Sequence, residues 1–467
     1  MEDEDELFHS GQCTDEESLS ESEDQCLPPD KPEEIQTIHH IFVEHSKLEF
    51  FTIKFLLILS STAIIILLPL YLEAINKSSD AYSMIYINTT FIFLVLFILI
   101  LLAKQCLKGF KNVNVLNPPV SWIKLLLLSV FYVGSAFMII YAVDRKRVMC
   151  HLQDPIKGVI LVFSLVNYFF FCKRMMGLQR IFSTTTIIVG LFISVDYGLC
   201  DEFRCRGNER ERRSDDAGVW TWQTHSIWAA VYIAGLFLFA TFFTLLDRFL
   251  VPVGMIPPSR TSTQLLTTVS RMVAFQNASP QLRTITTNSS SKKQTSCLIL
   301  AFYLQTAAWM LSTLLFWTDI IPTLGKGSNT TQLLANFRNG LECHFAHELS
   351  TSECQYATLY GWLFMLSYFT FFLCSLRFLM LCQSAVYTLS LATSSLPLVG
   401  IWWSLFKMNL TETGMIMWSP SVTGELICAL LGLPIVIIGL TLLCKSHFKE
   451  CKLSKMTPSC LTSTQLA

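Results

Sequence analysis

Charged residues are scarce in this sequence: Asp, Glu, Lys and Arg make up 15% of its 467 residues, whereas about 25% is usual. Hydrophobic residues reach 52%, and Phe alone occurs 35 times. This composition excludes a disordered chain and argues against an ordinary soluble enzyme. The motifs of zinc proteases, Gly-x-Ser-x-Gly hydrolases and P-loop ATPases are also missing. We therefore expect no enzyme activity, no cofactor and no ATP-driven pumping.

The sequence also lacks a signal peptide and a nucleic-acid-binding patch. No apolar run precedes about residue 50 and the N-terminus is acidic, so we expect no cleavable signal peptide. The basic residues flank apolar segments and form no patch with interleaved aromatic residues, which argues against a nucleic-acid partner.

The charge that is present is distributed unevenly along the chain. Residues 1–50 carry 16 acidic and two basic residues, whereas residues 51–467 carry 32 basic and 19 acidic residues, a net charge of +13.

Long apolar runs dominate the rest of the chain and predict an all-α membrane protein. A bilayer core needs roughly 17–25 mostly apolar residues per helix. The candidate segments are residues 51–72, 84–103, 123–143, 156–172, 181–197, 227–246, 297–320, 359–376, 380–406 and 426–444. We therefore predict a multi-pass protein with about ten transmembrane helices in the lipid bilayer.

The positions of Lys and Arg near helix ends predict the orientation. With ten helices, both termini lie on one side, which we place in the cytosol. That side holds Lys104, Lys108, Lys111, Lys173, Arg174, Arg248, Lys292, Lys293, Lys445, Lys449, Lys452 and Lys455. Two loops depart from this rule, because residues 145–147 and the mixed-charge segment 201–216 fall on the far side.

The same patterns divide the chain into five regions. Residues 1–48 are an acidic, disordered cytosolic tail, and residues 49–250 are a first transmembrane half with helices one to five plus helix six of the second repeat. Residues 251–296 are a Ser- and Thr-rich cytosolic linker, residues 297–446 hold helices seven to ten, and residues 447–467 are a cytosolic tail. Glycosylation sequons at Asn76, Asn329 and Asn409 fall on the predicted lumenal side.

Ten helices favour two halves of five, and an odd number per half inverts the second copy in the membrane, as in many carriers. The charged junction Asp144-Arg145-Lys146-Arg147 follows helix three, and Arg377 follows helix eight. A short basic turn at residues 172–180 then leads to a helix with Gly190 in mid-span. This layout resembles the drug/metabolite transporter superfamily, which includes the nucleotide-sugar carriers.

The second half carries a more specific pattern between residues 300 and 410. It reads Asn336-Phe337-Arg338-Asn339-Gly340-Leu341-Glu342-Cys343, then Cys354, and later Ser384-Ala385-Val386-Tyr387-Thr388 with Pro397 beyond. This order resembles the chloroquine-resistance-transporter-like branch of that superfamily. The resemblance implies two inverted five-helix repeats and a carrier of peptides, thiols, amino acids or organic cations, often proton-coupled. It also implies a lysosomal, vacuolar or endosomal membrane. The acidic tail, the long linker, the 201–216 loop and the fewer loop cysteines depart from the pattern and leave the substrate open.

Four cysteines in predicted lumenal loops are candidates for disulfides. Cys343 and Cys354 lie eleven residues apart in one loop, and Cys200 and Cys205 form a second candidate pair. Free thiols are the alternative for both pairs. Cys343, His344, His347 and Cys354 also have the donor types of a metal site, but the irregular spacing argues against one.

Charged residues at the start of helix four are the first candidates for substrate binding or coupling. Charges within a membrane usually face a cavity or a partner. Asp154 suits a cationic group or a proton, and Lys157 or Arg145 suits an anionic end, so a zwitterionic peptide or amino acid fits the set. An interfacial cluster whose side chains extend to water is the alternative.

A polar face on helix nine is the second candidate. Ser384, Tyr387 and Thr388 follow i, i+3, i+4 spacing, and Gln383 and Thr393 extend the line. Such a face avoids lipid, so it points inward, either to substrate or to hydrogen bonds between helices. Pro397 predicts a kink in this helix.

These patterns predict a secondary carrier that moves a small solute, with or without protons, by alternating access. One alternative is a nucleotide-sugar carrier of the Golgi or endoplasmic reticulum. A second alternative, from a different class, is a membrane receptor or scaffold that does not transport. The oligomeric state is not predicted.

Overall fold

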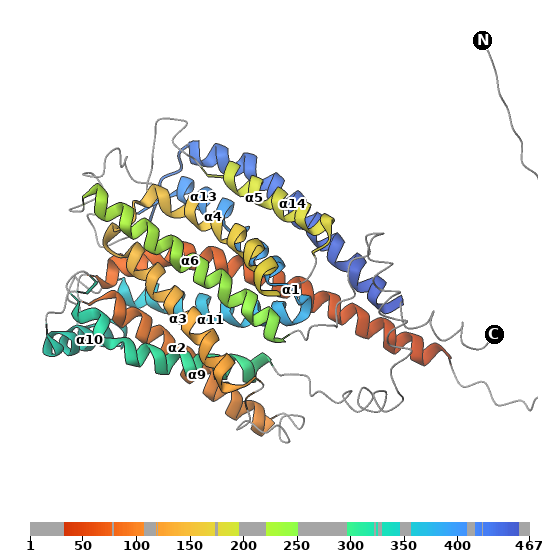
Figure 1. The fold of residues 1–467 in the computed structure, drawn as a ribbon, viewed down its shortest axis with the longest axis horizontal. Coiled ribbons are helices and arrows are strands. Elements are labelled where there is room, and N and C mark those ends of the chain that lie inside the picture. Colours follow the sequence, from red (N-terminus) through yellow and green to blue (C-terminus); the bar gives the residue numbers. More distant parts are fainter. Residues whose placement is uncertain are drawn as a thin grey trace, which may run out of the picture. The chain divides into compact units, whose positions relative to one another are not determined.

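The computed structural model describes residues 32–76, 79–106, 118, 120–172, 176–195, 221–250, 297–321, 324–325, 329–345, 356–408, 416–422 and 424–456. The chain divides into two units, residues 1–49 and 50–467, and the second holds the helical bundle (Figure 1). The predicted linker 251–296, the loop 201–216, Cys200, Cys205, Cys354 and Asn409 lie outside the described residues.

The described part is a bundle of helices with one short hairpin (Figure 1). The α-helices are α1 (Pro32–Ile75), α2 (Ala81–Cys106), α3 (Trp122–Val143), α4 (Cys150–Asn167), α5 (Leu178–Ile193), α6 (Trp222–Leu250), α9 (Cys297–Leu314), α10 (Thr330–Phe345), α11 (Ala357–Cys382), α12 (Ala385–Thr393), α13 (Leu396–Leu405) and α14 (Gly424–Met456). Two 3-10 segments, η2 (Asp144–Lys146) and η6 (Leu315–Ile320), and a π-helical segment, η3 (Tyr168–Cys172), extend α3, α9 and α4. Strands β1 (Phe406–Met408) and β2 (Ile416–Trp418) pair antiparallel, with Phe406 opposite Trp418.

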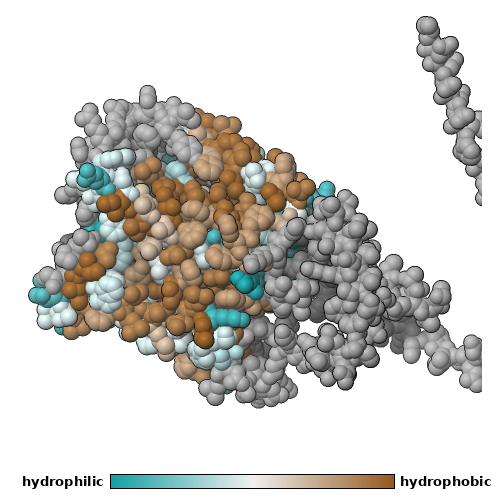
Figure 2. All heavy atoms as spheres, in the orientation of Figure 1, coloured by the Kyte–Doolittle hydropathy of each residue, from teal (hydrophilic) through white to brown (hydrophobic). Residues whose placement is uncertain are grey.

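The all-α membrane class is confirmed. Within the described residues, nine helical spans are long and apolar enough to cross a bilayer, and α5 is a shorter apolar helix of 16 residues. Each of the ten predicted apolar segments coincides with one of these helices. Apolar side chains cover much of the face shown in Figure 2, and on α2 the side chains of Leu94, Phe97 and Ile98 are exposed, as lipid-facing residues should be.

Helix α5 packs against α14 at unusually short range (Figure 1). A Cβ atom added at Gly190 would lie 2.8 Å from Val436 Cγ2, and one added at Gly432 would lie 2.5 Å from the backbone oxygen of Gly190. Two glycines facing each other therefore let the two backbones approach, which is the usual way to gain packing energy between membrane helices. This packing explains the mid-span Gly190 seen in the sequence.

The ninth apolar segment is broken into α12 and α13 at Ser394 and Ser395. Pro397 stands in the first turn of α13, where its missing N–H breaks no helical bond. The helix is therefore interrupted over two residues before the proline, and both serines keep right-handed helical backbone angles. The Ala392 carbonyl at the break accepts hydrogen bonds from Ser395 Oγ at 2.7 Å and from Ser61 Oγ of α1 at 2.9 Å. These serines supply the bonds that the interrupted helix no longer provides.

A buried charged cluster ties together the end of the bundle where α10 lies, here called the α10 end. Asp80 and Asp144 are both 1% exposed, and Arg147 is fully buried. Arg145 Nη2 lies 3.1 Å from Asp80 Oδ1, and Arg147 Nη1 lies 3.5 Å from Asp144 Oδ2. Asn76 donates to Asp144 at 2.6 Å and thereby joins the cluster.

The turn between α3 and α4 brings these arginines to the carboxylates. Arg145 and Lys146 have φ angles of 50° and 53°, in the left-handed region that costs roughly 1–2 kcal/mol per residue. The following residue, Arg147, donates to the backbone oxygens of Tyr141 at 2.8 Å and Leu324 at 2.6 Å, and its guanidinium lies 4.5 Å from the Trp228 ring centroid. Burial lowers the pKa of Arg147, and the Asp144 carboxylate partly offsets this. The basic run therefore departs from the orientation rule because it is structural.

Removing the buried cation should destabilise the protein strongly. We expect Arg147→Ala to lower the free energy of unfolding by about 3–5 kcal/mol, because Asp144 would stay buried with a weakened set of partners. Thermal unfolding of the detergent-purified protein measures this change. Arg338→Ala is the matched control, because Arg338 pairs with Glu342 at 2.7 Å on the exposed face of α10. Equal melting temperatures for the two variants would contradict a structural role for the cluster.

Helix α10 rests on the bundle through a polar contact that the sequence does not reveal. His344 is 2% exposed, its Nδ1 donates to the Gly340 oxygen at 2.6 Å, and its Nε2 accepts from the Tyr71 hydroxyl of α1. This arrangement fits a neutral imidazole, and burial lowers the pKa of His344. Asn336 adds a bond from α10 to Asp80 at 2.7 Å.

This contact should make stability depend on pH. Since the pKa of His344 is lower in the folded state than the roughly 6.5 of an unfolded histidine, the unfolded state binds more protons below that pH. The contact therefore contributes fully to the free energy of unfolding above about pH 6.5. This contribution is lost as the pH falls from there to the lower pKa of the folded state. We expect the melting temperature of the wild type to fall more between pH 7.5 and 5.5 than that of His344→Gln. Parallel pH profiles for the two proteins would rule out this role.

Candidate functional site

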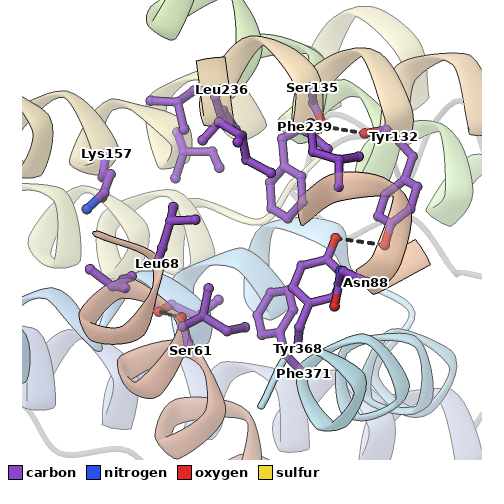
Figure 3. Close-up of a pocket in the computed structure, with 18 of the residues that line it drawn as sticks. Ser61, Leu68, Asn88, Tyr132, Ser135, Lys157, Leu236, Phe239, Tyr368 and Phe371 are labelled. Atoms are coloured by element: carbon purple, nitrogen blue, oxygen red, sulfur yellow. Dashed lines mark hydrogen bonds between the residues drawn. The ribbon is translucent and has the colours of Figure 1, made fainter. Parts of the chain in front are cut away.

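A cavity of about 210 Å³ lies in the middle of the bundle. Its wall includes side chains from α1, α2, α3, α4, α6, α9, α11, α12 and α13, most of them near the centres of their spans. Figure 3 shows Leu236 and Phe239 of α6 on one side, Tyr368 and Phe371 of α11 on the other, and Leu68 of α1 between them. Helices from both predicted halves of the chain therefore enclose one space.

The wall is mainly apolar, and its few polar groups are distinctive. The Asn88 Oδ1 atom and the Ser312 hydroxyl line the cavity, are buried, and have no hydrogen-bond partner within the described residues. An unpaired polar group in a membrane interior is unfavourable. The two groups are thus available to a polar group on a bound solute, with the Asn88 oxygen as acceptor and the Ser312 hydroxyl as donor or acceptor.

A pair of tyrosines bridges α3 and α11 at one side of the cavity. The hydroxyls of Tyr132 and Tyr368 lie 2.7 Å apart, as the dashed line in Figure 3 shows. The Tyr132 ring also packs against Phe242 of α6 and Phe372 of α11, with centroids 5.2 and 5.7 Å away. The hydrogen bond satisfies two buried hydroxyls at once and fixes the aromatic wall.

Two of the charged residues predicted at the start of helix four pair with each other. Lys157 Nζ donates to Asp154 Oδ1 at 2.7 Å, one turn away on α4. Lys157 lines the cavity and its side chain is 19% exposed, whereas the side chain of Asp154 is 36% exposed. The pair therefore links the cavity wall to the more open side of α4. A solute or a proton that reaches Asp154 would release the Lys157 ammonium.

Arg145, predicted beside this pair, is not in the cavity wall. It belongs to the buried cluster with Asp80 and Asp144. Its partners explain the difference, because two nearby carboxylates at the α10 end hold the guanidinium there. The zwitterion-binding set predicted from the sequence therefore reduces to Asp154 and Lys157.

The five residues of the predicted polar line on helix nine are buried except for Gln383, and Thr393 is the member that lines this cavity. Gln383 is exposed, with a φ of 50° at the end of α11. Ser384 caps α12 by accepting from the backbone N–H of Tyr387 at 3.3 Å, and Thr388 donates to the Ser384 oxygen at 3.0 Å. Leu389 and Ala392 of the same segment also reach the cavity.

Sequence reasoning missed the polar residues of α2, α3, α9 and α11. Asn88, Tyr132, Ser312 and Tyr368 lie within long apolar segments, and three of them adjoin another polar residue, as in Asn88-Thr89, Ser312-Thr313 and Ser367-Tyr368. Intramembrane polar residues usually face the interior of a bundle, so their place within a span was the available signal. Their convergence on one cavity depends on helix packing and could not be read from the sequence.

The remaining predicted sites concern the loops of the α10 end. Cys343 is buried near the end of α10, and its predicted partner Cys354 lies outside the described residues, so the disulfide stays a prediction. Asn329 is exposed at the start of α10, as a glycosylation site should be. The Asn76 Nδ2 atom, which a glycan would modify, instead donates to Asp144. Among the described residues no group of three His, Cys, Asp or Glu side chains is placed to bind a metal.

Comparison with known proteins does not assign this chain to a family. No protein-family model matches the chain, and no curated protein is similar to it.

The tyrosine bridge can be tested by a double-mutant cycle. Tyr132→Phe and Tyr368→Phe should each lower the melting temperature, because each leaves the other hydroxyl buried without its partner. The double variant should lose little more than either single one, which corresponds to a coupling of about 1 kcal/mol. Tyr86→Phe on α2 is the control, since the Tyr86 ring is half-buried and stacked on Tyr82. Strictly additive losses would contradict the bridge.

Proposed function

We propose that this protein is a secondary active transporter that binds a small organic solute in the central cavity and moves it by alternating access. The observation that carries this proposal is the central cavity, with walls from both predicted halves and two unpaired polar groups. Clefts between helices of a membrane bundle are where carriers hold their substrates.

The pattern of helix contacts supports two inverted repeats of five helices. In order of crossing, the first half is α1 to α5, and the second is α6, α9, α11, α12 with α13, and α14. Exchanging the halves maps three packed pairs onto themselves: α2 with α9, α4 with α12, and α5 with α14. The exchange also converts the α3–α9 contact into α2–α11, the α2–α3 contact into α9–α11, and the α4–α5 contact into α13–α14. All of these helix pairs are in contact.

The contacts of α1 and α6 follow the same exchange. Helix α6 packs against α3 and α4. The corresponding contacts of α1 would be with α11 and α12. Tyr71 of α1 stacks on Phe364 of α11 with centroids 5.6 Å apart, and Ser61 of α1 bonds to Ala392 of α12. A two-fold arrangement of this kind gives a carrier one central site with two equivalent ways of opening.

The broken helix supplies an element that such motion needs. The α12–α13 break lies beside the cavity, since Ala392, Thr393 and Leu396 all line it. Its counterpart in the first half, α4, packs against α12 and contributes Lys157 to the same wall. Discontinuous helices at mid-membrane are typical of transporter binding sites.

The chemistry of the cavity favours a small amphipathic solute. Its volume is below the roughly 300–1,000 Å³ of sites for drug-sized ligands, and aromatic and aliphatic groups dominate the wall. Lys157 is the one cation among its described lining residues, and Asp154 already pairs with it. A nucleotide diphosphate would demand several free donors, so this wall fits an amino acid, a small peptide, a thiol or an organic cation better than a nucleotide sugar.

The organelle and the coupling ion rest on other grounds. The resemblance of residues 336–397 to the chloroquine-resistance-transporter-like branch supports a lysosomal, vacuolar or endosomal membrane. Asp154 supports proton coupling, because its protonation would remove the partner of Lys157. A scaffold that binds no solute has no use for unpaired polar groups that line a central cavity, which makes it the weaker candidate.

Transport by purified protein tests the proposal. In proteoliposomes with an acidic interior, we expect export or uptake of labelled amino acids, dipeptides or organic cations that exceeds empty liposomes and depends on the pH gradient. Asp154→Asn should lose the gradient dependence but keep exchange of internal for external solute, because only proton binding is removed. Arg338→Ala, on the exposed face of α10, is the control and should match the wild type.

The outcomes separate the alternatives. Exchange of nucleotide sugars for nucleoside monophosphates would replace the proposed substrate class. Absence of flux for every solute class, from protein that unfolds cooperatively, would favour the receptor or scaffold. Gradient dependence that survives in Asp154→Asn would remove Asp154 from the coupling step and leave the carrier intact.

A further inference from the structure

A second, larger cavity of about 940 Å³ lies at the opposite end of the bundle from α10. It opens between the start of the α1 span, the start of α5, the start of α12 and the end of the α14 span. Its lining residues are Phe51, Lys54, Ile58, Gln179, Tyr387, Leu391, Ile437, Leu440, Thr441, Cys444, Lys445 and Phe448. It shares no lining residue with the central cavity, and we call it the α1–α14 groove.

Positive charge gathers in this groove without a carboxylate in its wall. Lys54 and Lys445 are the charged lining residues, and within the described part of the chain neither forms an ion pair. The Lys54 ammonium lies 4.2 Å from the Phe50 ring centroid and 5.3 Å from that of Tyr387, and it donates to Cys444 Sγ at 3.2 Å. These contacts hold the ammonium in place, and none of the described residues among them supplies a negative charge.

A neighbouring arginine extends the positive region. Arg180 Nη2 lies 3.4 Å from His447 Nδ1, and the His447 ring packs against Tyr387 with centroids 5.7 Å apart. Lys54 and Arg180 therefore lie on two sides of Tyr387, and Lys445 lines the same groove. Tyr387 is thus explained by this groove and not by the central cavity for which its position on helix nine was predicted.

Polarity changes along the groove as it does along a phospholipid. On each helix the polar residue stands nearer the end of the span and an apolar residue stands one or two turns deeper. The pairs, with the polar residue named first, are Lys54 and Ile58 on α1, Tyr387 and Leu391 on α12, and Lys445 and Ile437 on α14. Phe51 and Phe448, which are 59% and 43% exposed, flank the opening at the level of the lysines.

We propose that the α1–α14 groove binds one anionic phospholipid from the leaflet at this end. The headgroup phosphate would lie between the Lys54 and Lys445 ammonium groups, and an acyl chain would run along Ile58, Leu391 and Ile437. Lysines at the membrane surface attract anionic lipids, each with about 1 kcal/mol, and the apolar depth of the groove matches a chain rather than a soluble phosphate. The lipid would pack on α12, which also contributes to the central cavity.

Native mass spectrometry of the full-length protein in detergent tests this proposal. The probes are phosphatidylserine and phosphatidylcholine with identical palmitoyl and oleoyl chains. We expect the wild type to bind phosphatidylserine in preference. The double variant Lys54→Gln/Lys445→Gln should bind phosphatidylserine about 30-fold more weakly, since two losses of about 1 kcal/mol each correspond to that factor. Its binding of phosphatidylcholine should weaken much less, because the choline cation already compensates the phosphate of that lipid.

Matched variants separate charge from folding. Lys54→Arg/Lys445→Arg should retain the preference, and Lys104→Gln, which removes an exposed lysine at the same end of the bundle, should bind both lipids as the wild type does. If the double Gln variant does not elute as folded protein, the single change at exposed Lys445 carries the test, with about a fivefold weakening. Wild-type affinity in the Gln variants, or equal binding of the two lipids by the wild type, would overturn the proposal. Binding of inorganic phosphate alone at the same lysines would also overturn it.

Discussion

Two buried carboxylates need counter-ions at a depth where water does not reach, and the α10 end of the bundle depends on how that need is met. Asp80 immediately precedes α2, and Asp144 immediately follows α3. Each is 1% exposed, so each would be expensive to leave unpaired. Arg145 and Arg147 meet this demand only because the chain between α3 and α4 turns sharply through two left-handed residues. Asn76 and Asn336 complete the set and bring the end of α1 and the external helix α10 to the same place.

The same requirement, that every polar group in hydrocarbon find a partner, shapes the centre of the protein. The break between α12 and α13 frees backbone groups, and serines on both sides of the contact supply the missing bonds. Tyr132 and Tyr368 satisfy each other, and Lys157 satisfies Asp154. Several other buried polar atoms, such as Ser164 Oγ and Gln305 Oε1, also lack a partner within the described residues. The Asn88 oxygen and the Ser312 hydroxyl differ from these two because they line the central cavity, where a bound solute can reach them.

The helices could be predicted from the sequence, whereas the partners of their polar residues could not. Run length is enough to find a bilayer helix, because about 20 apolar residues in a row have few other uses. The buried face of such a helix is hidden, since lipid and protein neighbours are equally apolar. On α2, Leu96 is fully buried while Leu94 is 49% exposed, and nothing in the residue type tells them apart. The Asp154–Lys157 pair was predictable because its partners are one turn apart, whereas the convergence of Asn88, Tyr132 and Tyr368 depends on three helices distant in sequence.

The basic residues of the membrane body therefore do three different things. The positive-inside rule predicts that those at helix ends orient the chain. Arg145 and Arg147 pair with Asp80 and Asp144, so their positions follow the carboxylates. Orientation alone does not explain Lys54, which is held over aromatic rings in a groove whose described lining residues include no carboxylate. A charge placed only for orientation would extend to water. A lysine ammonium that is held inside the groove implies that an anion binds to it there.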